Sequence, residues 1–126
     1  MINGLDHVHI MCRDLEKSVQ YFTDLFGGKV ETRTELRGFP MVRMSVQGIH
    51  FNLHKTDSKA APFETGKATP GLDHIGFLVK GLEKVVEDLK KKGGKFSVDF
   101  THGAGGVKFA FIDGPDGIRI ELIERP

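Results

Sequence analysis

The chain has 126 residues, of which 39% are hydrophobic and 28% are charged, and its formal net charge is +1. This length suits one compact domain or two small repeats that share a core. The small net charge gives no field that would attract nucleic acid or an anionic membrane, and no apolar run approaches the roughly 18 to 20 residues of a membrane span. We therefore expect neither of these partners. The single cysteine, Cys12, favours a reducing cytoplasm over a disulfide framework.

The first half of the chain predicts one strand, one helix and three further strands. Residues 5–12, LDHVHIMC, alternate in character as a half-buried strand does. A helix follows, because Asp14 can cap it, apolar residues recur at helical spacing, and Gly27-Gly28 can end it. The three further strands are predicted at residues 29–35, 41–46 and 49–54.

The second half repeats this order of elements. It begins with the strand pattern LDHIGFLV at residues 72–79, and its helix is expected to end at Gly93-Gly94. The remaining elements are a helix at residues 82–92 and strands at 95–100, 107–113 and 118–124. The segment 57–71 between the halves is rich in Lys, Ser, Thr, Gly and Pro, which predicts a linker loop.

Four blocks of similar sequence recur in the same order in the two halves. LDHVHI returns as LDHIGF, LEK and GGK each occur twice, and GIHFNLHK lies over GIRIELIE. The nearly constant spacing between the blocks indicates a duplicated unit. We therefore predict an α+β fold of two βαβββ modules, residues 1–56 and residues 72–126, joined by the linker 57–71.

Alternation along the strands brings polar residues to equivalent places in the two modules. Side chains alternate across a strand, so Val8 and Ile10 face one side while His7 and His9 face the other. The apolar sets belong under the helices, and the polar sets belong on the opposite face, which two curved sheets could enclose as a cavity. The polar residues at equivalent strand positions are His7, Asn52, His74 and Glu121.

Three stretches resemble the vicinal oxygen chelate superfamily: LDHVHI with DLEKSVQYFTDLFGG, then GLDHIGFLV, then FIDGPDGIRIELIE. They cover nearly the whole chain in the family's order. The superfamily includes glyoxalase I, methylmalonyl-CoA epimerase, fosfomycin-resistance thiol transferases, extradiol dioxygenases and bleomycin-binding proteins. The resemblance implies an open mixed β-barrel of two modules, with the helices outside, around a divalent metal. It also implies a homodimer, in which modules pair within a chain or between chains.

The resemblance implies the metal ligands as well. His7, His74 and Glu121 fall on ligand positions of the family, and Asn52 falls on the fourth position. Imidazole and carboxylate ligands suit Ni, Co, Zn, Mn or Fe as divalent ions. Open positions on the ion would let a small substrate chelate through two neighbouring oxygens, and the ion would act as a Lewis acid.

The fourth position departs from part of the family. Glyoxalase I has a glutamate there and methylmalonyl-CoA epimerase has a glutamine, whereas Asn52 carries a shorter amide. Asn52 could ligate the metal, reach it through water, or hydrogen-bond a neighbour or the substrate. His9 and His54 share its face and are candidate ligands or proton carriers. The candidate catalytic residues are therefore Glu121, His9 and His54.

Several functions fit this pattern. We predict a metal-dependent lyase or isomerase of the glyoxalase type, which acts on a small molecule with vicinal oxygens through an enediolate-like intermediate. The three ligands also suit an extradiol-type Fe(II) dioxygenase. A drug-binding protein of the bleomycin-resistance kind, which generally lacks the metal ligands, and a thiol transferase are further alternatives.

Overall fold

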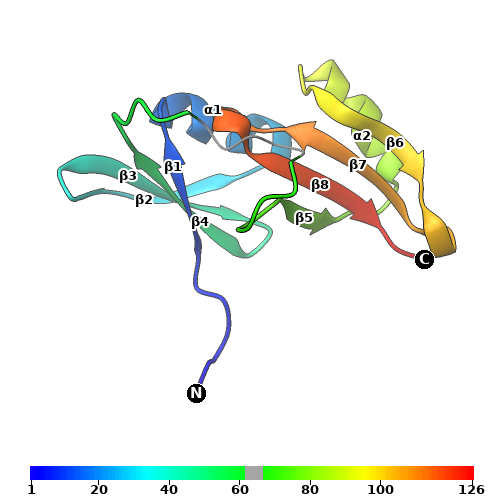
Figure 1. The fold of residues 1–126 in the computed structure, drawn as a ribbon, viewed down its shortest axis with the longest axis horizontal. Helices are drawn as coiled ribbons and strands as arrows, with labels where there is room; N and C mark the ends of the chain where they lie inside the picture. The colour runs from blue at the N-terminus through cyan, green and yellow to red at the C-terminus, as the bar shows by residue number, and fades with distance from the viewer. Residues whose placement is uncertain (62–66) are drawn as a thin grey trace. The chain divides into compact units, whose positions relative to one another are not determined.

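The computed structural model describes residues 1–61 and 67–126, and the chain divides into two compact units, Met1–Ala60 and Ala61–Pro126. Each unit consists of one four-stranded mixed sheet and one α-helix in the order β-α-β-β-β (Figure 1). The predicted α+β fold of two such modules is confirmed. Neither sheet closes on itself, because each has two edge strands.

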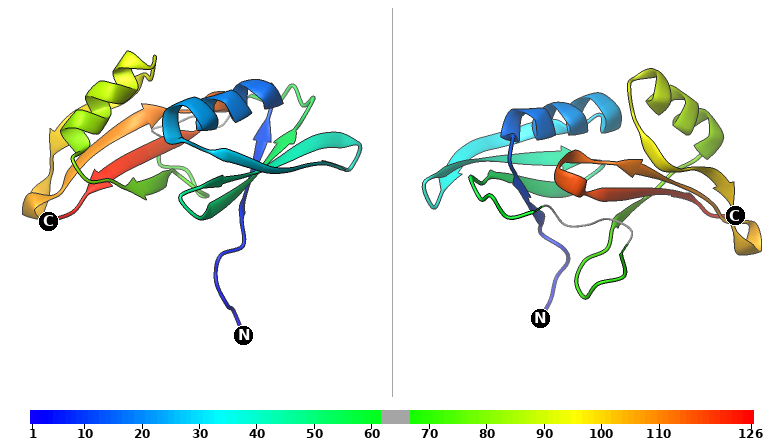
Figure 2. Two further views of the ribbon diagram at one scale, coloured as in Figure 1. Left: turned by 180° about the vertical axis from the view of Figure 1, so that it is seen from behind. Right: turned by 45° about the horizontal axis from the view of Figure 1, so that its top comes forward.

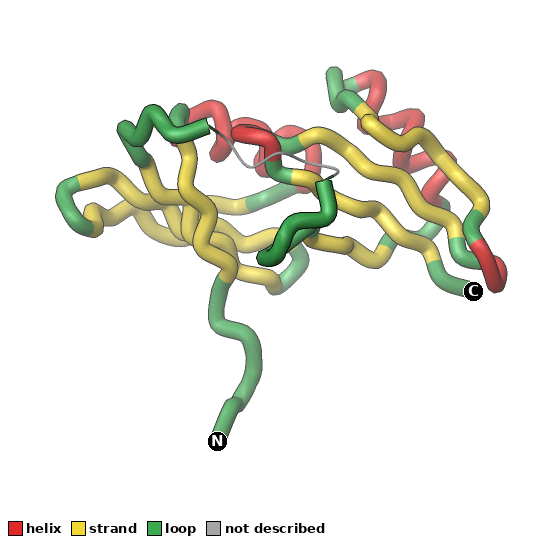
Figure 3. The backbone as a smooth tube through the Cα atoms, in the orientation of Figure 1, coloured by secondary structure: helices red, strands yellow, loops and turns green. Residues whose placement is uncertain are grey.

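Unit 1 has its strands in the spatial order β1-β4-β3-β2. The parallel pair β1 and β4 occupies one side of the sheet, and the other neighbours are antiparallel. Short turns join β2 to β3 and β3 to β4 (Figure 3). The elements are β1 (Val8–Cys12), α1 (Leu15–Phe26), β2 (Lys29–Leu36), β3 (Phe39–Val46) and β4 (Ile49–Lys55).

The helix α1 begins and ends where the sequence predicts. Asp14 caps its first turn by accepting a hydrogen bond from the backbone N–H of Lys17 at 3.1 Å, and Gly27 ends it in the left-handed conformation with φ of 65°. The helix packs on β3 and β4, where the ring of Phe22 stacks on that of Phe51 at a centroid distance of 5.5 Å. This packing buries the apolar face of the sheet (Figure 2).

Unit 2 repeats this arrangement with the strand order β5-β8-β7-β6. The parallel pair is now β5 and β8, and α2 packs on β6, β7 and β8. The elements are β5 (Ile75–Leu78), α2 (Leu82–Lys91), β6 (Phe96–His102), β7 (Lys108–Asp113) and β8 (Arg119–Glu124), with short 3-10 turns at Ala104–Gly106 and Pro115–Gly117.

The first strand of each module is shorter than predicted. Ladder pairing starts at Val8, opposite Phe51, and at Ile75, opposite Ile120, so His7 and His74 lie just before their strands. His102 is the exposed last residue of β6. The alternation of faces is confirmed in the first strand, where Ile10 is buried and His9 is exposed.

Two further expectations concern regions outside the sheets. The predicted linker, residues 57–71, contains residues 62–66, which lie outside the described residues. Within the described residues, neither helix is sufficiently long and apolar to span a membrane. The open barrel and the homodimer stay predictions.

Candidate metal centre

The predicted ligands of unit 2 come together in the structure. Glu121 lies on β8 opposite Gly76 of β5, and His74 immediately precedes β5. The Nε2 atom of His74 lies 3.1 Å from Oε2 of Glu121. A methyl group at Gly76 would meet this same oxygen at 3.4 Å, so the glycine leaves the face of the sheet beside the carboxylate open.

The separation of these two atoms fits two ligands of one metal ion. Metal–nitrogen and metal–oxygen bonds to zinc are about 2.0 to 2.2 Å long, so two ligand atoms lie roughly 2.9 Å apart at a right angle and roughly 3.4 Å apart at a tetrahedral angle. The observed 3.1 Å lies between these values. The contact is an ordinary hydrogen bond between the two side chains, and its spacing and ligand types also fit two ligands of one divalent ion.

Asp73 holds the other nitrogen of His74. Its Oδ2 lies 2.7 Å from Nδ1 of the imidazole, and Nη1 of Arg119 lies 3.5 Å from the same oxygen. The hydrogen bond with His74 lowers the pKa of the Asp73 carboxyl below its ordinary value, and the charges of His74 and Arg119 act in the same direction. A carboxylate only accepts, so Asp73 favours a proton on Nδ1 of His74, while Nε2 is the nitrogen that faces the second carboxylate, Glu121.

His7 in unit 1 has the same support. Oδ2 of Asp6 lies 2.7 Å from Nδ1 of His7, and Arg43 approaches that oxygen at 3.6 Å. The hydrogen bond with His7, followed by the charge of Arg43, lowers the pKa of the Asp6 carboxyl. His7 is thus oriented with Nε2 available as a metal ligand.

Asn52 occupies the place in unit 1 that Glu121 occupies in unit 2. It lies on β4 opposite His9, just as Glu121 lies opposite Gly76. Its side chain is buried, and its Oδ1 accepts a hydrogen bond of 3.4 Å from Nη1 of Arg43. The amide oxygen that could bind a metal therefore already has a cationic partner.

His9 and His54 form a directed pair beside these residues. Nε2 of His54 lies 2.8 Å from the carbonyl oxygen of Leu36, which can only accept, so His54 donates there. The Nδ1 atom of a neutral His54 must then accept, and it lies 3.0 Å from Nε2 of His9. The pKa of His9 is lowered, first by partial burial and then by the neighbouring His54 and His7. Neutral His9 thus keeps its lone pair on Nδ1.

Each unit taken alone contributes part of the predicted ligand set. Unit 2 brings His74 and Glu121 together, whereas His7 and Asn52 belong to unit 1. Across the residues that the structure describes, no group of three or more His, Cys, Asp or Glu side chains is placed to hold a metal ion. The assembly of His7 with the pair in unit 2 therefore stays a prediction.

Sequence reasoning missed the two aspartates that contact the histidines. Asp6 and Asp73 belong to the LDH block that occurs in both modules, so the repeated Asp-His pair was the available signal. The strand positions of Arg43 and Arg119 alone do not show which groups they contact. In the structure these two side chains approach the aspartates.

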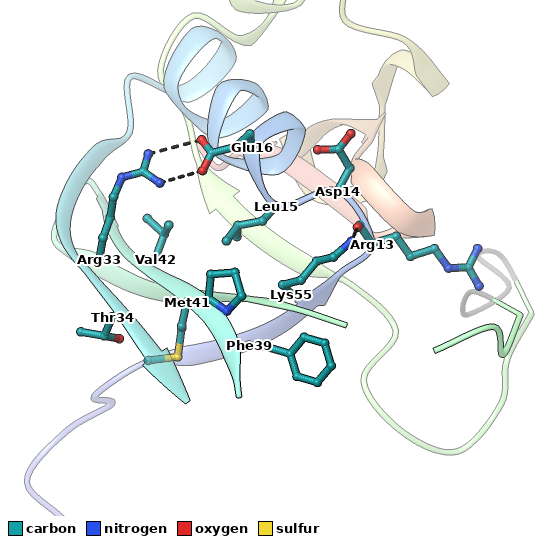
Figure 4. Close-up of a pocket in the computed structure, with 11 residues that line it drawn as sticks. Arg13, Asp14, Leu15, Glu16, Arg33, Thr34, Phe39, Met41, Val42 and Lys55 are labelled. Atoms are coloured by element: carbon teal, nitrogen blue, oxygen red, sulfur yellow. Dashed lines mark hydrogen bonds and ion pairs between the residues drawn. The ribbon is translucent and has the colours of Figure 1, made fainter. Parts of the chain in front are cut away.

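A cavity of about 610 Å³ lies elsewhere in unit 1, between the first turn of α1 and the strands β2 and β3 (Figure 4). Arg33 donates hydrogen bonds to both carboxylate oxygens of Glu16, and Lys55 donates to the backbone carbonyl of Arg13. A cavity of about 420 Å³ occupies the corresponding place in unit 2, beside the first turn of α2. None of the predicted site residues lines either cavity, so both are separate from the candidate metal centre.

Comparison with known proteins identifies the family. The sequence matches the model of the Glyoxalase/Bleomycin resistance protein/Dioxygenase superfamily over residues 4–122. The chain belongs to this superfamily. The match covers both modules and all six predicted site residues, so the resemblance found in the sequence is confirmed.

The curated relatives of this chain range from proteins of nearly the same length to proteins more than twice as long. The chain is 29% identical over 127 residues to the uncharacterized protein YwkD of Bacillus subtilis, with 99% of each chain covered. Mitochondrial methylmalonyl-CoA epimerase of Homo sapiens is 29% identical over 134 residues, with 96% of this chain and 73% of the epimerase covered. Glyoxalase I of Saccharomyces cerevisiae is 28% identical over 145 residues; 94% of this chain is covered, but it spans only 44% of that enzyme.

Solved structures share the fold. A glyoxalase family protein from Enterococcus faecalis superposes with a TM-score of 0.84 at 21% identity, with 96% of this chain and 97% of the other covered. The fosfomycin resistance protein FosX from Listeria monocytogenes, solved with Mn(II) and sulfate, gives a TM-score of 0.74 at 17% identity, with 100% and 95% covered.

Proposed function

We propose that this superfamily member is a metal-dependent lyase or isomerase of the glyoxalase type, which acts on a small molecule with two neighbouring oxygen atoms. The observation that carries the proposal is the 3.1 Å approach of His74 Nε2 and Glu121 Oε2 from distant parts of the sequence. Relatives with the names of an epimerase and of glyoxalase I support this class of reaction.

His7, His74 and Glu121 would hold the metal, with the three residues drawn from one chain or from two chains of a homodimer. Two imidazoles and a carboxylate suit Ni, Co, Zn, Mn or Fe as the divalent ion. When bound, the ion would supply Lewis-acid stabilisation of the negative charge that develops on the substrate oxygens as an enediolate forms.

His9 is the residue that we assign to proton transfer. The Leu36 carbonyl and His54 together leave the Nδ1 lone pair of His9 free to accept a carbon-bound proton next to the substrate carbonyl. Both nitrogens of His54 are engaged in this chain of hydrogen bonds, so His54 acts by orienting His9. Glu121 would share the proton transfer only when its carboxylate has an oxygen free of the metal.

A second function is favoured by one specific observation. Because Arg43 engages the oxygen of Asn52, the remaining ligand set consists of two histidines and one carboxylate. This is the ligand set that non-heme Fe(II) oxygenases use, with open positions for substrate and oxygen. An extradiol-type dioxygenase acting on a catechol-like substrate is therefore the alternative.

Metal binding tests the shared part of both functions. Purified full-length protein is analysed for bound elements and then titrated with Mn(II), Ni(II), Co(II), Zn(II) and Fe(II). We expect His74→Ala and Glu121→Gln to lose binding, while His102→Ala, at the exposed end of β6, serves as a matched control and binds as the wild type does. A wild-type protein that binds none of these ions would refute the proposal.

The reaction class is tested without oxygen. Candidate substrates that carry a carbonyl beside a hydroxyl or a second carbonyl are incubated in deuterated water under nitrogen, and deuterium uptake at carbon is followed by NMR. Metal-dependent uptake that His9→Ala abolishes supports the lyase or isomerase. Oxygen consumption with catechols, which needs Fe(II), would instead support the dioxygenase.

A further inference from the structure

The same three-residue contact occurs in both modules. In each, an aspartate Oδ2 lies 2.7 Å from Nδ1 of the histidine that follows it, as seen for Asp6 with His7 and for Asp73 with His74. In each, an arginine Nη1 then approaches that same carboxylate oxygen, at 3.6 Å in unit 1 and 3.5 Å in unit 2. The two modules therefore present an arginine–aspartate–histidine series of matching geometry.

The two arginines do not occupy equivalent places in the repeat. Arg43 lies on β3 opposite Asn52, whereas the residue opposite Glu121 in unit 2 is Phe111. Arg119 comes from β8 instead, and its guanidinium lies over the ring of Phe111 at 3.9 Å from the ring centre. Arg119 thus makes in unit 2 the contact with the aspartate that Arg43 makes in unit 1, although the two arginines come from different strands.

The direction of these hydrogen bonds determines which nitrogen can bind a metal. A carboxylate only accepts, so the aspartate keeps the proton on Nδ1 and leaves the Nε2 lone pair for a metal. In unit 2 this nitrogen faces an oxygen of Glu121 at 3.1 Å, a contact that a proton bridges without metal and that a metal ion would bridge once bound. Hydrogen bonds of this kind orient metal-binding imidazoles and increase their basicity.

We infer that Asp6 and Asp73 are positioning residues that fix the rings of His7 and His74 for metal binding, and that Arg43 and Arg119 hold the two aspartates in place. This inference rests on the proposed metal centre. The arginines are thereby assigned to the protein's own carboxylates, and no substrate group is needed to explain their positions.

The test measures metal affinity and the imidazole tautomer. Asp6→Ala and Asp73→Ala are titrated calorimetrically with Zn(II) and Mn(II), and we expect each to bind about 10- to 100-fold more weakly than the wild type. The Asn variants keep an acceptor of the same shape, so they should bind with intermediate affinity. Arg43→Met and Arg119→Met should show smaller losses. Asp99→Ala is the matched control, because Asp99 is exposed on β6 and its carboxylate pairs with Lys90.

NMR gives a readout that a merely structural role would not move. Two-bond proton–nitrogen correlations should show Nδ1 protonated in His7 and His74 of the zinc-loaded wild type, and a broadened or altered pattern in the Ala variants. Tight wild-type binding with unchanged affinity in both Ala variants would overturn this inference alone. A wild-type protein that binds no ion would overturn the proposed function with it.

Discussion

His9 donates its Nε2 proton to Nδ1 of His54 across 3.0 Å, and the carbonyl oxygen of Leu36 sets the direction of this hydrogen bond. The carbonyl accepts the hydrogen bond from the only N–H group of a neutral His54. Nδ1 of His54 can therefore accept a hydrogen bond from His9 but cannot donate one to it. The pair therefore has one orientation, which exposes a defined nitrogen of His9.

This relationship predicts unequal effects of mutation at the two histidines. We expect His9→Ala to lower kcat about 100- to 10,000-fold with little change in KM, as for loss of a general base. His54→Ala should lower kcat by up to about 100-fold, because it only misplaces His9. Steady-state kinetics with the substrate found by deuterium uptake checks both.

Two controls separate this role from a structural one. Added imidazole should partly restore His9→Ala, and His50→Ala, whose ring bonds Glu31 on the same sheet, should retain activity. Wild-type kcat in His9→Ala would contradict the assignment.

Asn52 allows a second prediction, about the number of ligands. Because its Oδ1 accepts from Arg43, we expect Asn52→Ala to keep metal affinity within about threefold of the wild type, well below the 10- to 100-fold loss typical of even an indirect metal contact. The same variant should unfold about 0.5 to 1.5 kcal/mol more easily, since the hydrogen bond between buried Asn52 and half-buried Arg43 is lost. Calorimetric titration decides the first point and chemical denaturation the second. Loss of binding comparable with that of His74→Ala would make Asn52 a fourth ligand.

Much of the fold could be predicted from the sequence because each module obeys simple local rules. The alternation of Val8 and Ile10 with His7 and His9 reports a half-buried strand, and this burial pattern is found in β1. The turn at Arg37-Gly38 likewise has positive φ at both residues, 53° and 81°, as a tight hairpin requires.

The site depends on information that a sequence pattern does not contain. The His9–His54 hydrogen bond arises because β1 and β4 pair in parallel, with a register that places Met11, two residues after His9, opposite His54. Alternation predicts that His9 and His54 share a face, but it does not give the register between strands that are far apart in the chain. The approach of Arg119 to Asp73 has the same origin.

The paired glycines that end each helix give a third prediction. A Cβ atom at Gly28 would lie 2.9 Å from the backbone oxygen of Phe22, and one at Gly94 would lie 2.9 Å from that of Leu89. These neighbours are backbone atoms of the last helical turn, which cannot move cheaply. We expect Gly28→Ala and Gly94→Ala each to lower the free energy of unfolding by about 1 to 3 kcal/mol.

Urea denaturation of the two variants checks this prediction. Gly76→Ala is the control for stability, because a Cβ there would make only an ordinary contact of 3.4 Å with Glu121. Equal stability of Gly28→Ala and Gly76→Ala would show that the helix end adjusts without cost.

The fourth prediction concerns the start of α2, which is capped from a distant strand. In unit 1, Asp14 caps the helix from the residue just before it. The corresponding residue of unit 2 is Gly81, which has no side chain to act as a cap. The carboxylate of Glu124 on β8 accepts instead from the backbone N–H groups of Leu82 and Gly81, at 2.9 and 3.1 Å. These two hydrogen bonds, the one from Leu82 first, lower the pKa of Glu124 below its ordinary value of 4.5.

A lowered pKa in the folded state means that the ionised carboxylate stabilises the fold. This contribution is complete above the unfolded-state pKa, near 4.5, and is lost as the pH falls through the lower folded-state value. We therefore expect Glu124→Gln to be less stable than the wild type at pH 7 and to lose less stability on acidification. Denaturation midpoints between pH 7 and pH 3 measure both effects. The control is Glu87→Gln, on the exposed side of the same helix, which should keep the wild-type pH profile of stability. If Glu124→Gln also kept the wild-type profile, the cap would have no stabilising role.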